Sequence, residues 1–407
     1  MNNLSLYIHI PFCVRKCNYC DFLSAPCDEY TRQRYVESLC REMEERAEAF
    51  QDKKVDTVFF GGGTPSILSA KQIEQIVSTV RSRFHLLPDA EISMEMNPGT
   101  VDREKLETYK RLGINRLSIG LQSANNEELK ILGRIHTWEE FLQTWKLVRE
   151  VGFSNVNIDL MSALPGQTLA SYEETLRKVL ALKPEHISAY SLIVEEGTPF
   201  FEWFGEEGKR QKELPDEVID RQMYELTKKL LEEQGYYRYE ISNYALKDYE
   251  CKHNIGYWKR KEYLGLGLGA ASLIADVRCT NITDLQTYLE VGKQREKQEE
   301  CDYGCIQKNQ ESIEIDTKSK KWIEEQIELS QADQMEEFMF LGLRMMEGVS
   351  LEEFEKKFRK TLQEIYGEQI ETLEKQQLLK FNHETGKYAL TLQGIDVSNQ
   401  VFVEFIE

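Results

Sequence analysis

The chain has 407 residues and a formal net charge of −19. Hydrophobic residues make up 41% of it and charged residues 30%, which is the composition of a soluble globular protein rather than of a membrane or disordered one. Its length exceeds what one hydrophobic core usually serves, so we expect two domains. An acidic chain without a long basic stripe repels polyanions, and we therefore expect no nucleic-acid partner.

The apolar runs and the cysteine usage predict a cellular location. No apolar run approaches the roughly 18 residues of a membrane span. Residues 1–5 lack the basic and apolar segments of a signal peptide. Nine cysteines in a chain of this length, three of them clustered, suit a reducing compartment. We therefore expect a cytoplasmic protein.

The first half of the chain alternates strand-like and helix-like segments. Short apolar runs are followed by stretches whose apolar residues recur every three or four positions, which predicts βα units around a parallel sheet. Ligands of such sheets bind at the carboxyl ends of the strands. Strands are expected at residues 4–10, 55–60, 92–96, 116–119, 156–161 and 186–192, and helices at 31–50, 71–84, 102–112, 138–151 and 171–182.

The last part of the chain is predicted to form a small second domain. Residues 291–331 are polar and charge-dense, which predicts a linker after a first domain of residues 1–290; its Cys301 and Cys305 are expected to be free thiols. Helices followed by a hairpin predict a winged-helix-like domain in residues 332–407, and its acidic helices argue against DNA binding. The helices are expected at 335–346, 351–366 and 370–379, and the hairpin at 379–390.

A cysteine motif carries the strongest functional signal. The motif Cys13-x-x-x-Cys17-x-x-Cys20 follows directly on the first expected strand. A cubane [4Fe–4S] cluster usually takes four thiolates, so three leave one iron open to another ligand. Zinc sites instead combine a cysteine pair with a second pair downstream, which disfavours a zinc interpretation. The spacing resembles that of the radical S-adenosylmethionine (SAM) family.

This resemblance implies a fold, two cofactors and a set of site residues. In the family, SAM binds the open iron, and an electron from the cluster splits it into methionine and a 5′-deoxyadenosyl radical. The expected fold is an α/β partial (βα)6 barrel with a small C-terminal α+β domain. Polar residues at successive strand ends are expected to contact SAM, and two tyrosines to flank the cluster loop: Gly62, Gly63, Thr64, Glu95, Gln122, Arg134, Asp159, Tyr7 and Tyr19.

The order of the motifs resembles the oxygen-independent coproporphyrinogen III oxidase-like family, which contains porphyrinogen oxidases and heme chaperones. Two departures separate this chain from the oxidases. Phe22 stands where the oxidase carries a further cysteine, and only three residues precede the first expected strand, where the oxidase has an extension. Both departures favour the chaperone branch.

A second motif points to heme. The run His253-Asn254-Ile255-Gly256-Tyr257-Trp258 matches the H-N-x-x-Y-W motif associated with heme binding in the chaperones. A neutral imidazole is a standard axial ligand of heme iron. We expect a loop near the carboxyl ends of the strands, with His253 as the iron ligand. Four basic residues around it are expected to favour the heme propionates: Lys252, Lys259, Arg260 and Lys261.

Three functions stay open at this point. The first is a chaperone that binds a cluster, SAM and heme and passes heme to acceptor proteins, including respiratory ones. The second is a porphyrinogen decarboxylase, and the third is a radical enzyme with another substrate, in which His253 is structural. An electron donor is an expected partner. A homodimer, a transient contact with membrane proteins and catalytic use of SAM cleavage are left open, and no catalytic residue is assigned.

Overall fold

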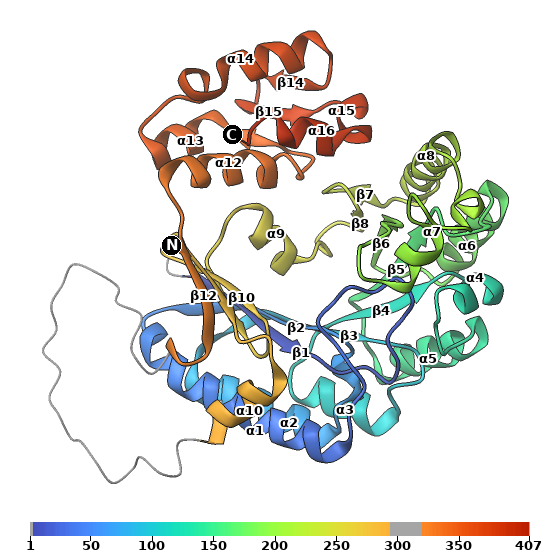
Figure 1. The fold of residues 1–407 in the computed structure, drawn as a ribbon, viewed down its shortest axis with the longest axis vertical. Helices are drawn as coiled ribbons and strands as arrows, with labels where there is room; N and C mark the ends of the chain where they lie inside the picture. The colour runs from blue at the N-terminus through green and yellow to red at the C-terminus, as the bar shows by residue number, and fades with distance from the viewer. Residues whose placement is uncertain (1–2, 294–319, 407) are drawn as a thin grey trace, which may run out of the picture.

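The computed structural model describes residues 3–293 and 320–406. Its centre is a twelve-stranded sheet in the order β12-β11-β10-β9-β1-β2-β3-β4-β5-β6-β8-β7 (Figure 1). The strands from β9 through β1 to β6 run parallel, and those at both edges are antiparallel. The six βα units that were expected are therefore present as an open barrel.

The first six strands and their helices lie close to the expected ranges. The strands are β1 Asn3–Ile10, β2 Lys54–Gly62, β3 His85–Met96, β4 Arg116–Gln122, β5 Val156–Ser162 and β6 His186–Ser191. The helices between them are α1 Glu29–Arg46, α2 Ala70–Arg83, α3 Arg103–Arg111, α4 Asn126–Ile131, α5 Trp138–Val151 and α6 Leu169–Ala181, with short 3-10 turns at Ala47–Phe50 and Pro65–Ile67. Side-chain caps begin the helices; Thr137, for example, forms a capping box with Glu140 at α5.

The two faces of the parallel sheet differ in chemistry. On β1, Leu4, Leu6, Ile8 and Ile10 are fully buried and pack against α1 and its neighbours. Successive side chains of a strand alternate between faces, so the residues between these leucines and isoleucines line the barrel interior. Parallel strands covered on both sides are usually apolar throughout. Here the inner face is largely polar; it carries Ser5, Tyr7, His9, Thr57, Ser93, Glu95, Arg116, Ser118, Asn157, Asp159, His186 and Ser188.

The chain after β6 completes and closes the barrel. It contains α7 Pro199–Phe204, a 3-10 turn at Gln211–Glu213, α8 Glu217–Glu233, β7 Tyr237–Arg238, β8 Asn243–Ala245, α9 Lys252–Trp258, β9 Tyr263–Leu266, β10 Ala271–Ile274, β11 Val277–Asn281 and α10 Leu285–Lys293. The His253 motif was expected in a loop and instead forms helix α9. In Figure 1 this helix lies between the barrel and the C-terminal domain.

Part of the segment predicted as a linker is a strand of the large sheet. Residues Ile323–Glu328 form β12, which pairs with β11 in the large sheet, and Trp322 is fully buried in the main core. β12 is an exposed edge strand rich in charged residues. Composition alone does not distinguish such a strand from a charged linker. The predicted thiols Cys301 and Cys305 lie outside the described residues.

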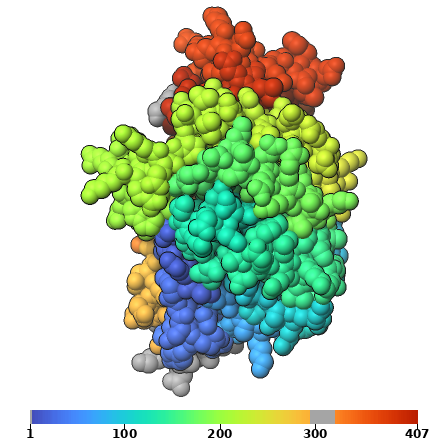
Figure 2. All heavy atoms as spheres, turned by 90° about the vertical axis from the view of Figure 1, so that its right-hand side faces the viewer, coloured from blue at the N-terminus to red at the C-terminus, as the bar shows by residue number. Residues whose placement is uncertain are grey.

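The C-terminal domain has its own core and forms a lobe at one end of the molecule (Figure 2). A left-handed residue, Arg359, ends one helix, so the expected helix at 351–366 is two helices. The domain contains α12 Gln331–Gly342, β13 Val349–Ser350, α13 Leu351–Phe358, α14 Leu362–Lys375, β14 Leu379–Asn382, β15 Lys387–Leu390, α15 Leu392–Asp396 and α16 Ser398–Val403. Its three strands pair in the order β13-β15-β14, and the hairpin is present as predicted. Throughout the described part of the chain, no helix combines the length and the apolarity that crossing a membrane requires.

Candidate functional site

The cysteine loop is held firmly at the carboxyl end of β1. The Cys13 amide donates to the Ala25 carbonyl at 3.2 Å, and the Ala25 amide donates to the Pro11 carbonyl at 3.0 Å, so the two ends of the loop are joined. Farther along, the Asn18 amide donates to the carbonyl of Leu132 beyond α4 at 3.0 Å. The loop is therefore fixed to the barrel rim on both sides, which fixes where its thiols lie.

Polar groups surround two of the three thiols. The Thr64 hydroxyl donates to the Cys13 sulfur at 3.4 Å, and the Arg134 guanidinium donates to the Cys17 sulfur at 3.6 Å. A Cβ atom on Gly63 would lie 3.0 Å from the Cys13 sulfur, so only glycine lets the backbone approach this closely. Hydrogen bonds to thiolate sulfurs stabilise their negative charge and tune a bound cluster.

Asn97 connects these two contacts, and its role was missed in the sequence. Its amide donates to the Thr64 hydroxyl at 2.9 Å, and its carbonyl accepts from Arg134 at 2.5 Å. The chain Cys13–Thr64–Asn97–Arg134–Cys17 therefore runs unbroken beneath the cysteine loop. The available signal was its position, because Asn97 directly follows β3 at the same rim as the other polar residues.

The Cys20 thiol lies near the other two thiols of the loop. Burial raises the pKa of the Cys20 thiol, and the neighbouring thiols of Cys17 and Cys13 add to this shift. Bound iron reverses such a shift because it holds the thiolate form. Among the described residues, no group of three His, Cys, Asp or Glu side chains is close enough to hold one metal ion.

Two buried carboxylates lie inside the barrel, on the two strands that flank β4. Glu95 on β3 accepts from the Gly62 amide at 3.2 Å. Asp159 on β5 accepts from the Asn157 amide at 2.7 Å and from the Ser118 hydroxyl at 3.2 Å. Burial, together with the charge of Asp159, raises the pKa of Glu95 to about 8, and burial also raises the pKa of Asp159. A cationic group placed between them would relieve this repulsion, which suits the sulfonium and amino groups of SAM.

The remaining predicted SAM residues meet at the same rim. Gln122 has a φ of +73°, and a Cβ atom on Gly120 would lie 3.2 Å from both the Gln122 amide nitrogen and the Arg134 guanidinium. Tyr19 packs edge-on against Phe200, and burial raises the pKa of its hydroxyl. The structure therefore brings together the cysteine loop, Gly62, Gly63, Thr64, Glu95, Gln122, Arg134, Asp159 and Tyr19.

Tyr7 lies deeper in the barrel than the other residues of this group. Its hydroxyl shares a hydrogen bond of 3.0 Å with the His9 ring, and its ring lies 6.4 Å from that of Phe59 and 6.5 Å from that of His253. Tyr7 therefore lies between the cysteine-loop end of the barrel and the His253 motif.

His253 lies in the amino-terminal half of the barrel, and the expected placement near the carboxyl ends is wrong. Its ring stacks on Phe59 at 5.1 Å, and its two nitrogens are bonded to the Thr57 hydroxyl and the Tyr257 hydroxyl at 2.9 Å each. The side chain is 1% exposed, and burial lowers the pKa of the imidazole to about 3, so the ring is neutral. Glu91 anchors α9 by accepting from the amides of Lys252 and His253.

The basic residues around the motif have partners within the protein, which corrects their expected role. Lys259 pairs with Glu347, Lys261 pairs with Asp56, and the buried Arg260 pairs with Glu337 and Asp276. Three of the four charges therefore stabilise the docking of α9 and its surroundings. Lys252 is exposed and has no ion-pair partner in the part of the chain that the structure describes.

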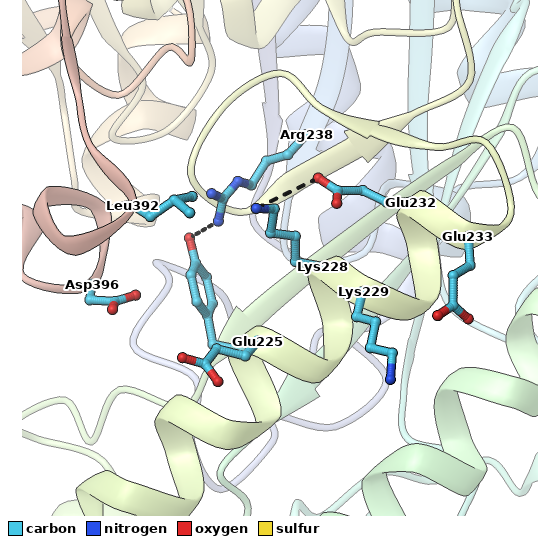
Figure 3. Close-up of a pocket in the computed structure, with 9 residues that line it drawn as sticks. Glu225, Lys228, Lys229, Glu232, Glu233, Arg238, Leu392 and Asp396 are labelled. Carbon is cyan, nitrogen blue, oxygen red and sulfur yellow. Dashed lines mark hydrogen bonds and ion pairs between the residues drawn. The ribbon is translucent and has the colours of Figure 1, made fainter. Parts of the chain in front are cut away.

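A separate cleft of about 680 Å³ lies between α8 and α15 (Figure 3). Arg238 lies between them and donates to the hydroxyl of Tyr224. The charges around the cleft are mixed: Lys228, Lys229 and Arg238 face Glu225, Glu232, Glu233 and Asp396. Such a lining favours neither an anion nor a flat apolar ligand, so this cleft is not the candidate site.

Comparisons with known proteins agree with this geometry. Residues 7–179 match the radical SAM superfamily, and residues 329–397 match the HemN C-terminal domain. The chain is 36% identical to the heme chaperone HemW of Lactococcus lactis, covering 99% of this chain and 97% of the relative, and 34% identical to that of Bacillus subtilis, covering 99% of each. HemW of Escherichia coli is 43% identical over 66% of this chain and 69% of its own. The solved structure of coproporphyrinogen III oxidase (HemN) from Escherichia coli shares the fold, with a TM-score of 0.81 and 24% identity over 99% of this chain and 90% of its own.

Proposed function

Because this chain belongs to the HemW family of radical SAM proteins, we propose that it is a heme chaperone that binds a [4Fe–4S] cluster, SAM and heme and passes the heme to acceptor proteins. The observation that carries the proposal is the hydrogen-bonded chain from Cys13 through Thr64, Asn97 and Arg134 to Cys17. This chain places hydrogen-bond donors beside two of the three thiolates that would bind the cluster.

In this proposal each group at the rim has a defined task. Cys13, Cys17 and Cys20 would hold the cluster through their thiolates, and SAM would bind beside it. The bound cluster would supply the electron for reductive cleavage of SAM. Arg134 and Thr64 stabilise the thiolates. Further contacts to SAM come from Tyr7, Tyr19, Gly62, Gly63, Glu95, Gln122 and Asp159.

We propose His253 as the heme ligand, and the observed bonds define what ligation requires. The ring is neutral, which an iron ligand must be. Its Nε2 atom is bonded to the Tyr257 hydroxyl, so ligation through that atom exchanges this hydrogen bond for iron. Because the His253 side chain is buried between α9 and the barrel, heme binding on this proposal also requires α9 to move.

The same proposal names the partners. These are an electron donor and heme-acceptor proteins, including respiratory ones, for a protein that works in the cytoplasm. A homodimer and a transient contact with membrane proteins are further arrangements that sedimentation of the heme-loaded protein, with and without vesicles that carry an acceptor, would separate.

The test is an anaerobic incubation of the cluster-loaded protein with SAM and reductant, once with heme and once with coproporphyrinogen III. We expect one heme to be retained per chain and handed to an apo-hemoprotein, and no protoporphyrinogen IX to form. Phe22, which replaces the extra cysteine of the oxidases, is 61% exposed and supplies no thiolate there. Repeated turnover of coproporphyrinogen III would overturn the chaperone proposal in favour of the oxidase.

A further inference from the structure

A buried row of hydrogen bonds connects helix α9 to the Asp159 carboxylate. The Cys251 amide, directly before α9, lies 3.2 Å from the Tyr239 hydroxyl oxygen. That hydroxyl lies 2.8 Å from His186 Nε2, and His186 Nδ1 lies 2.6 Å from the Asn157 carbonyl oxygen. The Asn157 amide in turn donates to Asp159 at 2.7 Å. The row therefore runs from the residue before α9 to the inner face of β5.

Donors and acceptors along this row agree in only one arrangement. Asp159 accepts hydrogen bonds, so Asn157 must present its amide group to it and its carbonyl oxygen to His186. His186 then donates from Nδ1, and its Nε2 atom accepts from the Tyr239 hydroxyl. The oxygen of Tyr239 is left to accept from the Cys251 amide. Burial lowers the pKa of His186 well below its usual value, so its ring is neutral and has one donor and one acceptor, as the row requires.

Two neighbouring hydroxyls lock Asn157 in this orientation. The Ser188 hydroxyl donates to its carbonyl oxygen at 3.1 Å, and its amide donates a second hydrogen to the Ser118 hydroxyl at 2.7 Å. The Ser118 hydroxyl donates a hydrogen bond to Asp159 at 3.2 Å. The members are almost fully buried, with exposures of 6% for Tyr239, 1% for His186 and 2% for Asn157, so water cannot replace a missing bond.

We infer that Tyr239, His186 and Asn157 are positioning residues that hold the Asp159 carboxylate for SAM and make its placement depend on the docked state of α9. The inference rests on the proposed SAM contact of Asp159. Any movement of α9 that carries Cys251 along removes the donor to Tyr239. The C-terminal domain acts on the same residue, because the Met346 amide donates to the Tyr239 carbonyl at 3.0 Å.

The first test deletes one oxygen atom. In cluster-loaded protein, Tyr239→Phe should weaken SAM binding, measured by equilibrium dialysis, about 3- to 10-fold, which corresponds to the loss of one buried hydrogen bond. The matched control is Tyr172→Phe, which deletes an equally buried hydroxyl bonded to Thr227 at 2.8 Å on α8 outside the barrel. Both variants should lose similar thermal stability, and only the first should lose SAM affinity.

A second variant distinguishes positioning from packing. His186→Asn keeps an N–H near the position of Nδ1 and should retain part of the affinity that His186→Ala loses. In the Asp159→Asn background, Tyr239→Phe should cost nothing further, because the two positions act through one contact. Equal SAM affinity in Tyr239→Phe and Tyr172→Phe, while Asp159→Asn binds weakly, would overturn the positioning role alone. Full SAM affinity in Asp159→Asn would overturn the proposed SAM contact and this inference together.

Discussion

At the residue scale, the two carboxylates at the rim determine how the protein responds to pH. Glu95 keeps its proton up to a pKa of about 8 because burial and the charge of Asp159 both oppose its ionisation. Around neutral pH the SAM-free protein therefore holds a proton on Glu95 that the unfolded chain has already released. This difference favours the folded state at low pH and is lost as the pH rises toward the folded-state pKa.

We predict that Glu95→Gln removes this pH dependence. Without SAM, the variant should be more stable than the wild type at pH 9, and the difference should shrink toward pH 5, because the amide stays neutral where the carboxyl must ionise. Thermal unfolding at several pH values measures the effect, with the exposed Glu206→Gln as control. A stability difference that stays constant from pH 5 to pH 9 would contradict the assignment of the raised pKa to Glu95.

The cysteines give a second prediction at this scale. Replacing Cys13, Cys17 or Cys20 by Ala should remove most of the iron and sulfide, because three thiolates are the minimum that holds such a cluster. Cys27→Ala is the control, because Cys27 is a nearby free thiol beyond the loop. This variant should keep its iron and sulfide. Iron and sulfide analysis after anaerobic reconstitution decides between them. If Cys27→Ala lost the cluster and Cys20→Ala kept it, the loop assignment would be wrong.

At the scale of the element, α9 is a short helix that closes the barrel from the side opposite the cysteine loop. The carboxylate of Glu91 meets its N-terminus, where unpaired backbone amides favour an acceptor. His253 fills the barrel below it, stacked on Phe59 and bonded to Thr57. With only seven residues, α9 depends on these contacts for its stability.

Heme binding by this element is tested with two substitutions that preserve side-chain volume. Tyr257→Phe frees the His253 Nε2 atom and should strengthen heme binding about 2- to 10-fold, the equivalent of one hydrogen bond. His253→Gln keeps a polar side chain beside Thr57 but offers no imidazole, so the Soret band should lose its histidine-ligated form. Heme titration followed by absorption measures both. An unchanged affinity and spectrum in both variants would assign His253 a structural role.

At the scale of the whole molecule, the C-terminal domain packs against α9 and the segment before it. The Arg344 guanidinium lies 4.4 Å above the ring of Trp258, and the Ile241 amide donates to the Arg344 carbonyl at 3.2 Å. Arg260 is buried between the domains and bonds to Glu337 of α12 at 2.5 Å. The domain therefore restricts α9, and movements of the two are expected to be linked.

This interface predicts a strong effect for Arg260. Arg260→Ala removes a buried guanidinium bonded to Glu337 and Asp276, while Arg278 stays paired with Glu337. It should lower the free energy of unfolding by about 3 kcal/mol, the low end for breaking a buried pair. Arg177→Ala removes an exposed i,i+4 pair with Glu173 and should cost only about 0–1 kcal/mol. Denaturant unfolding of both variants provides the comparison. Equal stability of the two variants would show that Arg260 contributes no more than a surface charge.

The sequence by itself determined the parts of this protein that follow from local patterns. Alternating apolar periods predicted the six βα units, and the spacing of Cys13, Cys17 and Cys20 predicted a loop with three thiols at one strand end. The residues that follow each strand were expected at one rim because parallel strands end on the same side. Each of these inferences needs only a short stretch of chain. The structure contains the six βα units and has the cysteine loop at the carboxyl end of β1.

Only the tertiary structure decided where the second motif lies and what surrounds it. The sequence around His253 does not show that Glu91 and Thr57, about 160 and 200 residues earlier, hold it in the amino-terminal half of the barrel. Nor do they show that Arg260 pairs with Glu337 rather than with a ligand. Long-range contacts of buried polar groups depend on how the strands are ordered and on how the barrel closes, and no local period encodes either.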